Sequence, residues 1–238
     1  MATHDPTRTY RAAVIGAGSG GLTLAIGLAG FGHDIVLIEG GAIGGDCTNV
    51  GCIPSKAFLH AAKVGESDPL GWTRGRRNSL RDEEDHDMAT HEQIALVRGW
   101  ARLTDRREPH VVVVSTPDGG EVEVRAEHVI VCAGSEPVRF PVDGLPEDRL
   151  VTNEELFELE RLPERIVLVG GGPISLEMAT AFRDVGTSVE IVELDDRILV
   201  SEDPEVSATV RAALEARGIR VHTGTSIERF DAATDTAY

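Results

Sequence analysis

Residues 11–39 read RAAVIGAGSGGLTLAIGLAGFGHDIVLIE and give the pattern of a strand, a helix and a second strand. Residues 11–15 form a short apolar run, and apolar positions at helical spacing follow over residues 22–31. Gly32 is placed to end that helix, and residues 34–39 form a second apolar strand that closes on an acid. This order predicts one βαβ unit of a parallel sheet.

The glycine loop inside this unit fits the pattern G-x-G-x-x-G, with Gly16, Gly18 and Gly21 at the three fixed positions. The first glycine permits a tight turn, the second lets a pyrophosphate approach the backbone, and the third allows close helix–strand packing. The helix start offers unpaired N–H groups to the phosphates. Glu39, at the end of the second strand, is placed to bind a ribose, so the unit predicts a dinucleotide site.

A second βαβ unit is expected from a strand at residues 165–169 to a strand at residues 188–193. Its loop has Gly170 and Gly172 but a serine at the third glycine position. Glu193 ends the following strand, and an acid there favours a free 2′-hydroxyl over a 2′-phosphate. The two units form a weak internal repeat, and the second predicts binding of NAD rather than NADP.

The remaining pattern completes an α/β fold with two Rossmann-like domains. We expect a domain boundary near residue 150, giving domains 1–150 and 151–238, with a β-meander insertion in the first and an incomplete second domain. Residues 66–92 are polar and predict a solvated surface excursion. The other expected helices are 53–64, 153–159 and 204–218, and the other expected strands are 111–115, 121–125, 128–132 and 219–222.

Composition excludes some classes of partner. The formal net charge of −17 disfavours nucleic acid and anionic membrane surfaces, since both are polyanions. No apolar run approaches the roughly 20 residues of a membrane span, and the first residues carry no secretory signal. These features predict a cytoplasmic protein.

Two of the three cysteines, Cys47 and Cys52, lie in the run GGDCTNVGCIPSK at residues 44–56. On a regular helix their spacing would give about 7.5 Å of rise, whereas a disulfide needs Cα atoms within about 7 Å. A pair here requires a distorted turn, which Gly51 and Pro54 permit. The spacing matches no zinc pattern, so no metal site is predicted. Cys132 follows an apolar run and is expected to be a buried small side chain.

This thirteen-residue run closely resembles the active-site signature of the class I pyridine nucleotide–disulfide oxidoreductases, which include dihydrolipoamide dehydrogenase, glutathione reductase and mercuric reductase. The run CAGSEP at residues 132–137 is similar to a linker motif of that family. The resemblance implies FAD and NAD as cofactors and electron transfer through a Cys47–Cys52 disulfide. The substrate would be a small or protein-bound dithiol or disulfide.

The resemblance also implies roles for particular residues. Cys52 would be the thiol next to the flavin and Cys47 the thiol that exchanges with substrate. Lys56 and Glu177 would form an ion pair beside the flavin. The cofactor-binding residues would be Gly16, Gly18, Gly21, Glu39, Gly45, Lys56 and Gly134 for FAD, and Gly170, Gly172 and Glu193 for NAD.

The sequence departs from the family beyond the second βαβ unit. Family members are much longer and homodimeric, and a carboxy-terminal dimerisation domain supplies a His–Glu pair as the acid–base catalyst. We expect that domain and that pair to be missing here. None of the eight histidines lies in a recognisable catalytic dyad.

Four alternatives compete with the leading prediction of a dihydrolipoamide dehydrogenase-like enzyme. A thioredoxin reductase would carry C-x-x-C in its nicotinamide domain, where this chain has no cysteine. An NADH oxidase needs a single redox cysteine, which leaves the second one unexplained. A mercuric reductase-like enzyme stays open, and so does a chain that binds nucleotide without turnover.

Overall fold

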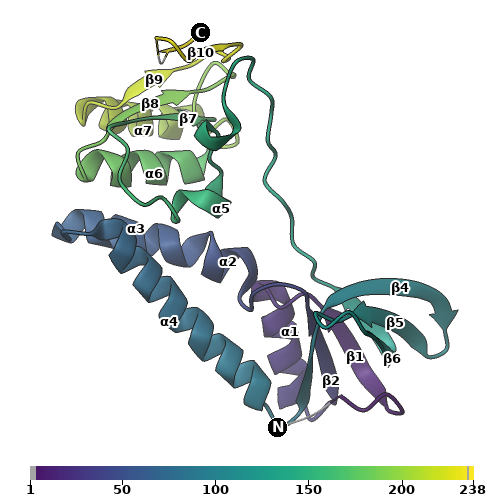
Figure 1. The fold of residues 1–238 in the computed structure, drawn as a ribbon. Coiled ribbons are helices and arrows are strands. Elements are labelled where there is room, and N and C mark those ends of the chain that lie inside the picture. Colours follow the sequence, from purple (N-terminus) through teal and green to yellow (C-terminus); the bar gives the residue numbers. More distant parts are fainter. Residues whose placement is uncertain (1–3, 235) are drawn as a thin grey trace. The chain divides into compact units, whose positions relative to one another are not determined.

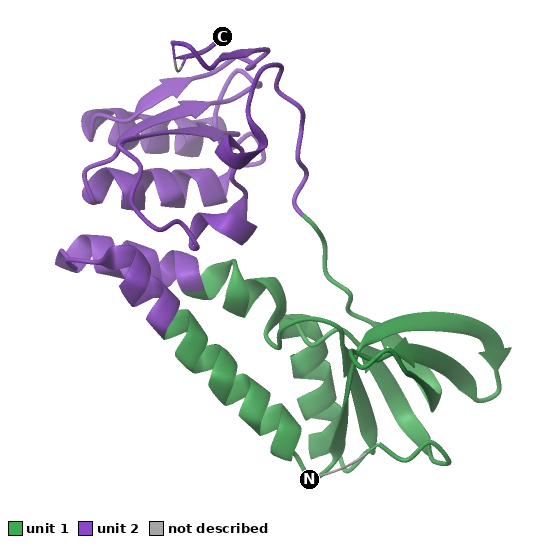
Figure 2. Cartoon of the chain, in the orientation of Figure 1, with its two compact units in different colours: residues 1–53, 76–136 green, residues 54–75, 137–238 purple. Residues whose placement is uncertain are grey.

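The computed structural model describes residues 4–234 and 236–238 (Figure 1). The chain divides into two compact units (Figure 2). The first contains residues 1–53 and 76–136, and the second contains residues 54–75 and 137–238. Each unit is built on a parallel sheet with the βαβ order, so the predicted class of two Rossmann-like folds is confirmed. The domain boundary near residue 150 stays a prediction.

The first unit contains a six-stranded sheet in the order β3-β2-β1-β6-β5-β4. β3, β2, β1 and β6 run parallel, and β5 and β4 continue the sheet as an antiparallel meander. The elements are β1 (Thr9–Ile15), α1 (Ser19–Gly30), β2 (Ile35–Glu39), α2 (Gly45–Asn49), β3 (Ile94–Arg98), β4 (Trp100–Arg107), β5 (His110–Ser115) and β6 (Glu121–Val131).

β1 lies between two parallel neighbours, which explains why residues 12–15 of this strand are apolar without interruption. Successive side chains point to opposite faces of a sheet. Ala12 and Val14 join the cluster that contains the buried residues of α1, whereas Ala13 joins the cluster that contains the buried valines of the meander. The strand therefore contributes to two cores, one on each face.

Two predicted strands in this unit need correction, and two further strands were not predicted. The expected strands 121–125 and 128–132 are one continuous strand, β6, which pairs antiparallel with β5 and then parallel with β1. No turn residue interrupts it, so the change of partner does not require a break. β3 and β4 were not predicted, because Gly99 alone separates them and offers little turn signal.

The expected surface excursion at residues 66–92 contains a long helix that was not predicted. Residues 69–90 form α4 (Pro69–Thr90), a helix of 22 residues, which follows α3 (Cys52–Val64). Its arginines, glutamates and leucines are good helix formers. One stripe at helical spacing is buried, formed by Leu70, Thr73, Arg77 and Met88. Two of these four residues are polar, so the stripe does not stand out as an apolar pattern.

The second unit contains a three-stranded parallel sheet in the order β7-β8-β9. A short helical turn and a helix precede the sheet, and two longer helices connect its strands. The elements are η1 (Glu147–Arg149), α5 (Asn153–Leu156), β7 (Arg165–Val169), α6 (Pro173–Asp184), β8 (Ser188–Val192), α7 (Pro204–Ala216), β9 (Arg220–His222), β10 (Phe230–Asp231) and β11 (Thr236–Ala237).

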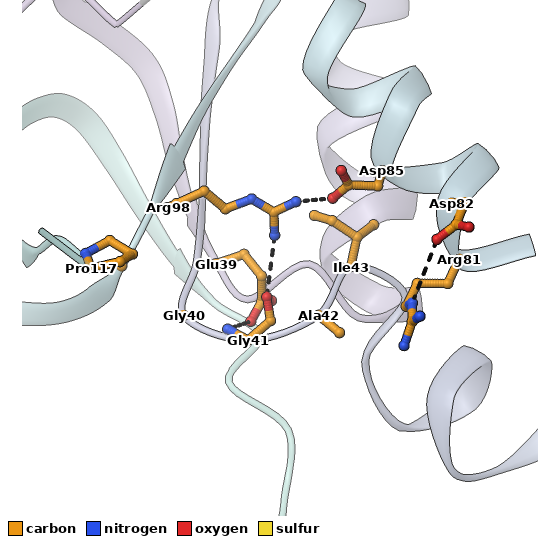
Figure 3. A pocket seen from close by; sticks show the side chains of 11 residues that line it. Glu39, Gly40, Gly41, Ala42, Ile43, Arg81, Asp82, Asp85, Arg98 and Pro117 are labelled. Atoms are coloured by element: carbon orange, nitrogen blue, oxygen red, sulfur yellow. Dashed lines mark hydrogen bonds and ion pairs between the residues drawn. The ribbon is translucent and has the colours of Figure 1, made fainter. Parts of the chain in front are cut away.

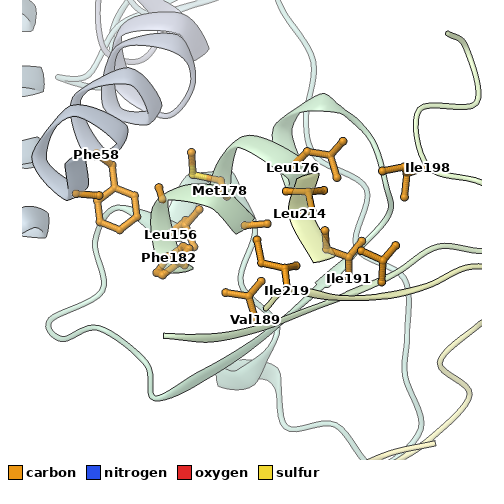
Figure 4. Close-up of a cluster of buried hydrophobic side chains, with 14 of the residues drawn as sticks. Phe58, Leu156, Leu176, Met178, Phe182, Val189, Ile191, Ile198, Leu214 and Ile219 are labelled. Atoms are coloured by element: carbon orange, nitrogen blue, oxygen red, sulfur yellow. The ribbon is translucent and has the colours of Figure 1, made fainter. Parts of the chain in front are cut away.

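The core of this unit brings α3, α5 and α6 together with the sheet (Figure 4). Phe58 of α3 and Phe182 of α6 are both fully buried, and their rings meet edge to face with centroids 4.9 Å apart. The Phe58 ring also packs against the Phe157 ring, with centroids 6.5 Å apart. No helix in the described part of the chain is both long enough and apolar enough to cross a bilayer.

Candidate functional site

The predicted glycine loop of the first unit joins β1 to α1, and its backbone is packed too closely for side chains at two positions. Gly16 has φ of +100°, and its N–H donates to the Ile38 carbonyl at 2.8 Å. A Cβ on Gly16 would lie 2.1 Å from the Cys132 carbonyl oxygen, and one on Gly21 would lie 1.8 Å from the Gly16 oxygen. The turn and the close helix–strand contact both require glycine.

The start of α1 is open to an anion. Gly18 is its N-cap and supplies no side-chain hydrogen bond, so the first N–H groups lack the usual cap. A Cβ on Gly20 would meet nothing within 4 Å. Gly45 lies against this loop, since its Cβ would be 2.6 Å from the Gly18 Cα. Gly134 follows β6 with φ of +75° and open space around it.

Glu39 ends β2 and turns its carboxylate back toward the glycine loop. One oxygen accepts the Ala17 N–H at 2.5 Å, and the other accepts the Gly41 N–H at 2.6 Å. The acid is therefore fixed between the phosphate-binding turn and its own loop, where a ribose hydroxyl could donate to it.

The second unit repeats this geometry. Gly170 has φ of +103°, and its N–H donates to the Val192 carbonyl at 2.8 Å, as Gly16 does with Ile38. Gly172 caps α6 without a side-chain hydrogen bond, and a Cβ there would meet nothing within 4 Å. Ser175, at the third glycine position, is half-buried in the first turn of α6.

The acid of the second unit makes the same pair of contacts as Glu39. Glu193 accepts the N–H of Gly171, the middle residue of the glycine loop, and the N–H of Asp195 at 2.8 Å. In both units the acid thus bridges the middle of the phosphate loop and the residue two positions beyond itself. Both loops fit a dinucleotide, because each combines an uncapped helix start, open space at a glycine and an acid beside them.

A cavity of about 440 Å³ opens beside Glu39 (Figure 3). The loop after β2, the end of β3 and the helix α4 contribute to it. Arg98 and Asp85 lie on its wall as an ion pair, and Arg98 also donates to the Gly41 carbonyl at 3.2 Å. Sequence reasoning missed both residues, because β3 was not predicted and α4 was assigned to a surface excursion.

The two cysteines lie on either side of a helix break. Cys47 is in α2, which ends at Asn49, and Cys52 is the first residue of α3. The break is tight, since a Cβ on Gly51 would lie 2.8 Å from the Asp46 carbonyl oxygen. The distorted turn predicted from the spacing is present, and both residues are in the thiol form.

The two thiols interact. The pKa of the Cys47 thiol is raised above its ordinary value, chiefly by a hydrogen bond with Cys52 and further by burial. Cys47 is half-buried, whereas Cys52 is exposed. Cys132, the third cysteine, is half-buried and packs against the core on the α1 side of the sheet.

Lys56 and Glu177 form the expected ion pair within the second unit. The Lys56 Nζ lies 2.7 Å and 2.6 Å from the two carboxylate oxygens of Glu177. Their side chains are 62% and 40% exposed, so the pair contributes at most about 1 kcal/mol to stability. Its role beside a flavin stays a prediction.

Two glycine turns, each with its own acid, together with a pair of interacting thiols are the features expected of a redox protein with two dinucleotide sites. Residues 10–237 match the pyridine nucleotide-disulphide oxidoreductase family, and the chain belongs to that family. Membership implies binding of FAD and of a pyridine nucleotide.

Two of the similar proteins carry different named activities. The chain is 34% identical over 235 residues to a dihydrolipoyl dehydrogenase of Pseudomonas aeruginosa, covering 90% of this chain and 50% of that protein. It is 32% identical over 238 residues to a mercuric reductase of Streptomyces lividans, covering 92% of this chain and 49% of that protein. The HOCl-induced flavoprotein disulfide reductase RclA from Escherichia coli superimposes with a TM-score of 0.82 at 29% identity, covering 92% of this chain and 50% of RclA. The chain spans about half the length of the relatives it matches.

Proposed function

We propose that the chain carries the redox half of an FAD- and NAD-linked dithiol oxidoreductase, with a dihydrolipoamide-like dithiol as substrate. The observation that carries this proposal is the Cys47–Cys52 pair. Two hydrogen-bonded thiols lie across a helix break in the same unit as a dinucleotide loop.

FAD is assigned to the first unit. Gly16, Gly18 and Gly21 shape the turn that would face its pyrophosphate. Gly45 begins α2 against Gly18, and Gly134 lies in the loop after β6. The Glu39 carboxylate would accept hydrogen bonds from the adenosine ribose. Bound FAD supplies a two-electron relay between the pyridine nucleotide and the protein thiols.

The protein thiols perform the exchange with substrate. In the oxidised protein, one thiolate of the substrate attacks Cys47 and releases the Cys52 sulfur as a thiolate. The second substrate thiolate then attacks the mixed disulfide and releases Cys47. The substrate leaves as a disulfide, and the chain gains two electrons as two thiols. Because the pKa of Cys47 is raised, this sulfur takes up a proton on release.

NAD is assigned to the second unit, at Gly170 and Gly172. The Glu193 carboxylate would accept a hydrogen bond from a free 2′-hydroxyl and repel a 2′-phosphate, so NADH should bind more tightly than NADPH. Fluorescence titration of the chain with each nucleotide tests this preference. Glu193→Ala should reduce the difference in affinity between NADH and NADPH. Equal affinities for the two nucleotides in the unaltered chain would contradict the assignment.

Stoichiometric oxidation of dihydrolipoamide tests the proposed reaction. The chain is first oxidised to the Cys47–Cys52 disulfide and mixed with one equivalent of the dithiol. Two new protein thiols at positions 47 and 52, located by mass spectrometry after alkylation, are the expected result. Cys47→Ser should abolish the transfer, whereas Cys132→Ser should not change it. Failure of the unaltered chain to form these thiols would favour a chain that binds nucleotide without turnover.

Mercuric ion is the second candidate substrate, favoured by the Streptomyces lividans relative. A thiol pair is a soft ligand suited to such an ion. A chain that binds Hg²⁺ through Cys47 and Cys52 but leaves dihydrolipoamide unoxidised would support this alternative.

A further inference from the structure

We infer that Arg98, held by Asp85, is a positioning residue for the adenosine end of FAD. This inference rests on the proposed assignment of FAD to the first unit. Arg98 lies at the carboxyl end of β3, beside Glu39 in the parallel pairing of β2 and β3. It fixes the loop that follows Glu39 rather than contacting Glu39 itself.

A chain of hydrogen bonds runs from α4 to the phosphate-binding turn. Asp85 on α4 pairs with the Arg98 guanidinium, which donates to the Gly41 carbonyl at 3.2 Å. The Gly41 N–H donates to one Glu39 oxygen at 2.6 Å, and the other oxygen accepts the Ala17 N–H. The Gly41 peptide is therefore held on both sides, by a cation at its carbonyl and by the ribose-binding acid at its N–H.

In the second unit, a backbone N–H and not a side chain donates to the carbonyl two residues after the acid. Gly41 corresponds to Asp195, and the Asp195 carbonyl accepts the backbone N–H of Gly224 at 2.6 Å. The next residue, Thr225, donates its N–H to the Glu193 carbonyl at 3.0 Å, as Gly99 does to the Glu39 carbonyl at 2.9 Å. Both units thus fix the loop after the acid from the end of the third parallel strand.

The two units use different donors for the same contact, a backbone N–H in one and an arginine side chain in the other. The first unit therefore needs an anchor for that side chain, and Asp85 on α4 supplies it. This role gives a reason for Asp85 within the charge run on α4. An arginine suits the position because its planar fork can donate to a carbonyl and a carboxylate together.

The test compares FAD with an FAD analogue that lacks the 2′-hydroxyl of its adenosine ribose. Arg98→Met and Asp85→Asn should each weaken FAD binding by about 2- to 12-fold, the effect of losing one hydrogen bond that holds the site. Binding of the deoxy analogue should change less than twofold, because it lacks a hydroxyl that Glu39 recognises. Arg98→Lys, which keeps the charge, should recover part of the affinity. The double variant should be no weaker than Arg98→Met alone.

Two controls separate positioning from general damage. Arg102→Met removes a cation that pairs with Glu121 on the same sheet, at 3.9 Å, and should leave FAD binding unchanged. NADH binding, assigned to the second unit, should be the same in every variant. An equal loss for FAD and its deoxy analogue, or no loss for either, would overturn the inference while the FAD assignment stands. A chain that takes up no FAD before any substitution would instead remove the proposed function and the inference with it.

Discussion

Gly20 and Gly21 are neighbours in the first turn of α1, yet a methyl group would meet opposite surroundings at the two positions. At Gly21 it would lie 1.8 Å from a backbone oxygen of the preceding turn, whereas at Gly20 it would meet nothing within 4 Å. Gly21→Ala should lower the free energy of unfolding by at least about 1–3 kcal/mol, since the backbone must move. Gly20→Ala should raise it by up to about 1 kcal/mol through helix propensity. Urea unfolding followed by circular dichroism checks both, and equal effects would contradict the packing described for this turn.

The reactivity of Cys47 is a second property set by a single contact. Its raised pKa, caused first by the hydrogen bond with Cys52, keeps the thiol protonated at neutral pH. Alkylation of Cys47 should therefore increase with pH through a midpoint above the usual cysteine value of about 8.5. In Cys52→Ala that midpoint should fall, because the main cause of the shift is removed. Rates of iodoacetamide labelling, located by mass spectrometry, measure it, with Cys132→Ser as the control. An unchanged midpoint in Cys52→Ala would exclude the hydrogen bond as the cause.

Packing between α3 and α6 is the main stabilising contact that the aromatic residues make in the second unit. Phe182 is fully buried against Phe58, so Phe182→Ala should cost about 3–5 kcal/mol in the free energy of unfolding. Phe31, which follows α1 and is 82% exposed, provides the matched control. Phe31→Ala should change stability by no more than about 0.5 kcal/mol. The denaturant midpoints of the two variants measure these changes. A similar loss of stability in both variants would contradict the described core.

The strands β8 and β9 are linked by charge as well as by backbone pairing. Glu190 on β8 pairs with Arg220 and with His222 on β9, and Arg220 is the main cause of its lowered pKa. A carboxyl whose pKa is lowered on folding stabilises the fold above its unfolded pKa of about 4.3 and loses that contribution as the pH falls.

Substitution of Glu190 tests this linkage. Glu190→Gln should reduce the free energy of unfolding at pH 7 by less than about 1 kcal/mol, because the pair is partly exposed. The difference from the unaltered chain should shrink at about pH 3, as the carboxyl takes up a proton. Urea titrations at the two pH values provide the comparison. A difference that persists at low pH would assign the effect to packing instead.

Elements with a strong local pattern were predictable from the sequence, and those fixed by distant contacts were not. The βαβ units, the two acids and the helix break at the cysteines follow from glycine spacing and apolar periodicity. α4 escaped prediction because Thr73 and Arg77 occupy its buried stripe. Arg98 escaped because its partner Gly41 lies 57 residues away, and no local pattern reports such a contact.

At the scale of the whole molecule, the weak sequence repeat corresponds to a repeat of individual hydrogen bonds. Glu39 and Glu193 make equivalent contacts in units that share few side chains, so the common feature is a backbone arrangement that an acid stabilises. The two units differ in the side chains and strands next to that backbone arrangement. The first has a thiol pair and a β-meander, and the second has the Lys56–Glu177 ion pair. The thiol pair in the first unit supports the proposed assignment of FAD to that unit.

The visible absorption spectrum of the purified chain tests the central claim most directly. The chain is loaded with FAD, freed of excess cofactor and reduced anaerobically with dithiothreitol. We expect a bound flavin spectrum that gains a long-wavelength charge-transfer band, because the Cys52 thiolate would lie against the flavin. Cys52→Ser should bind FAD without gaining the band. A chain that retains no flavin, or one whose band persists in Cys52→Ser, would contradict the assignment of FAD and the thiol pair to one site.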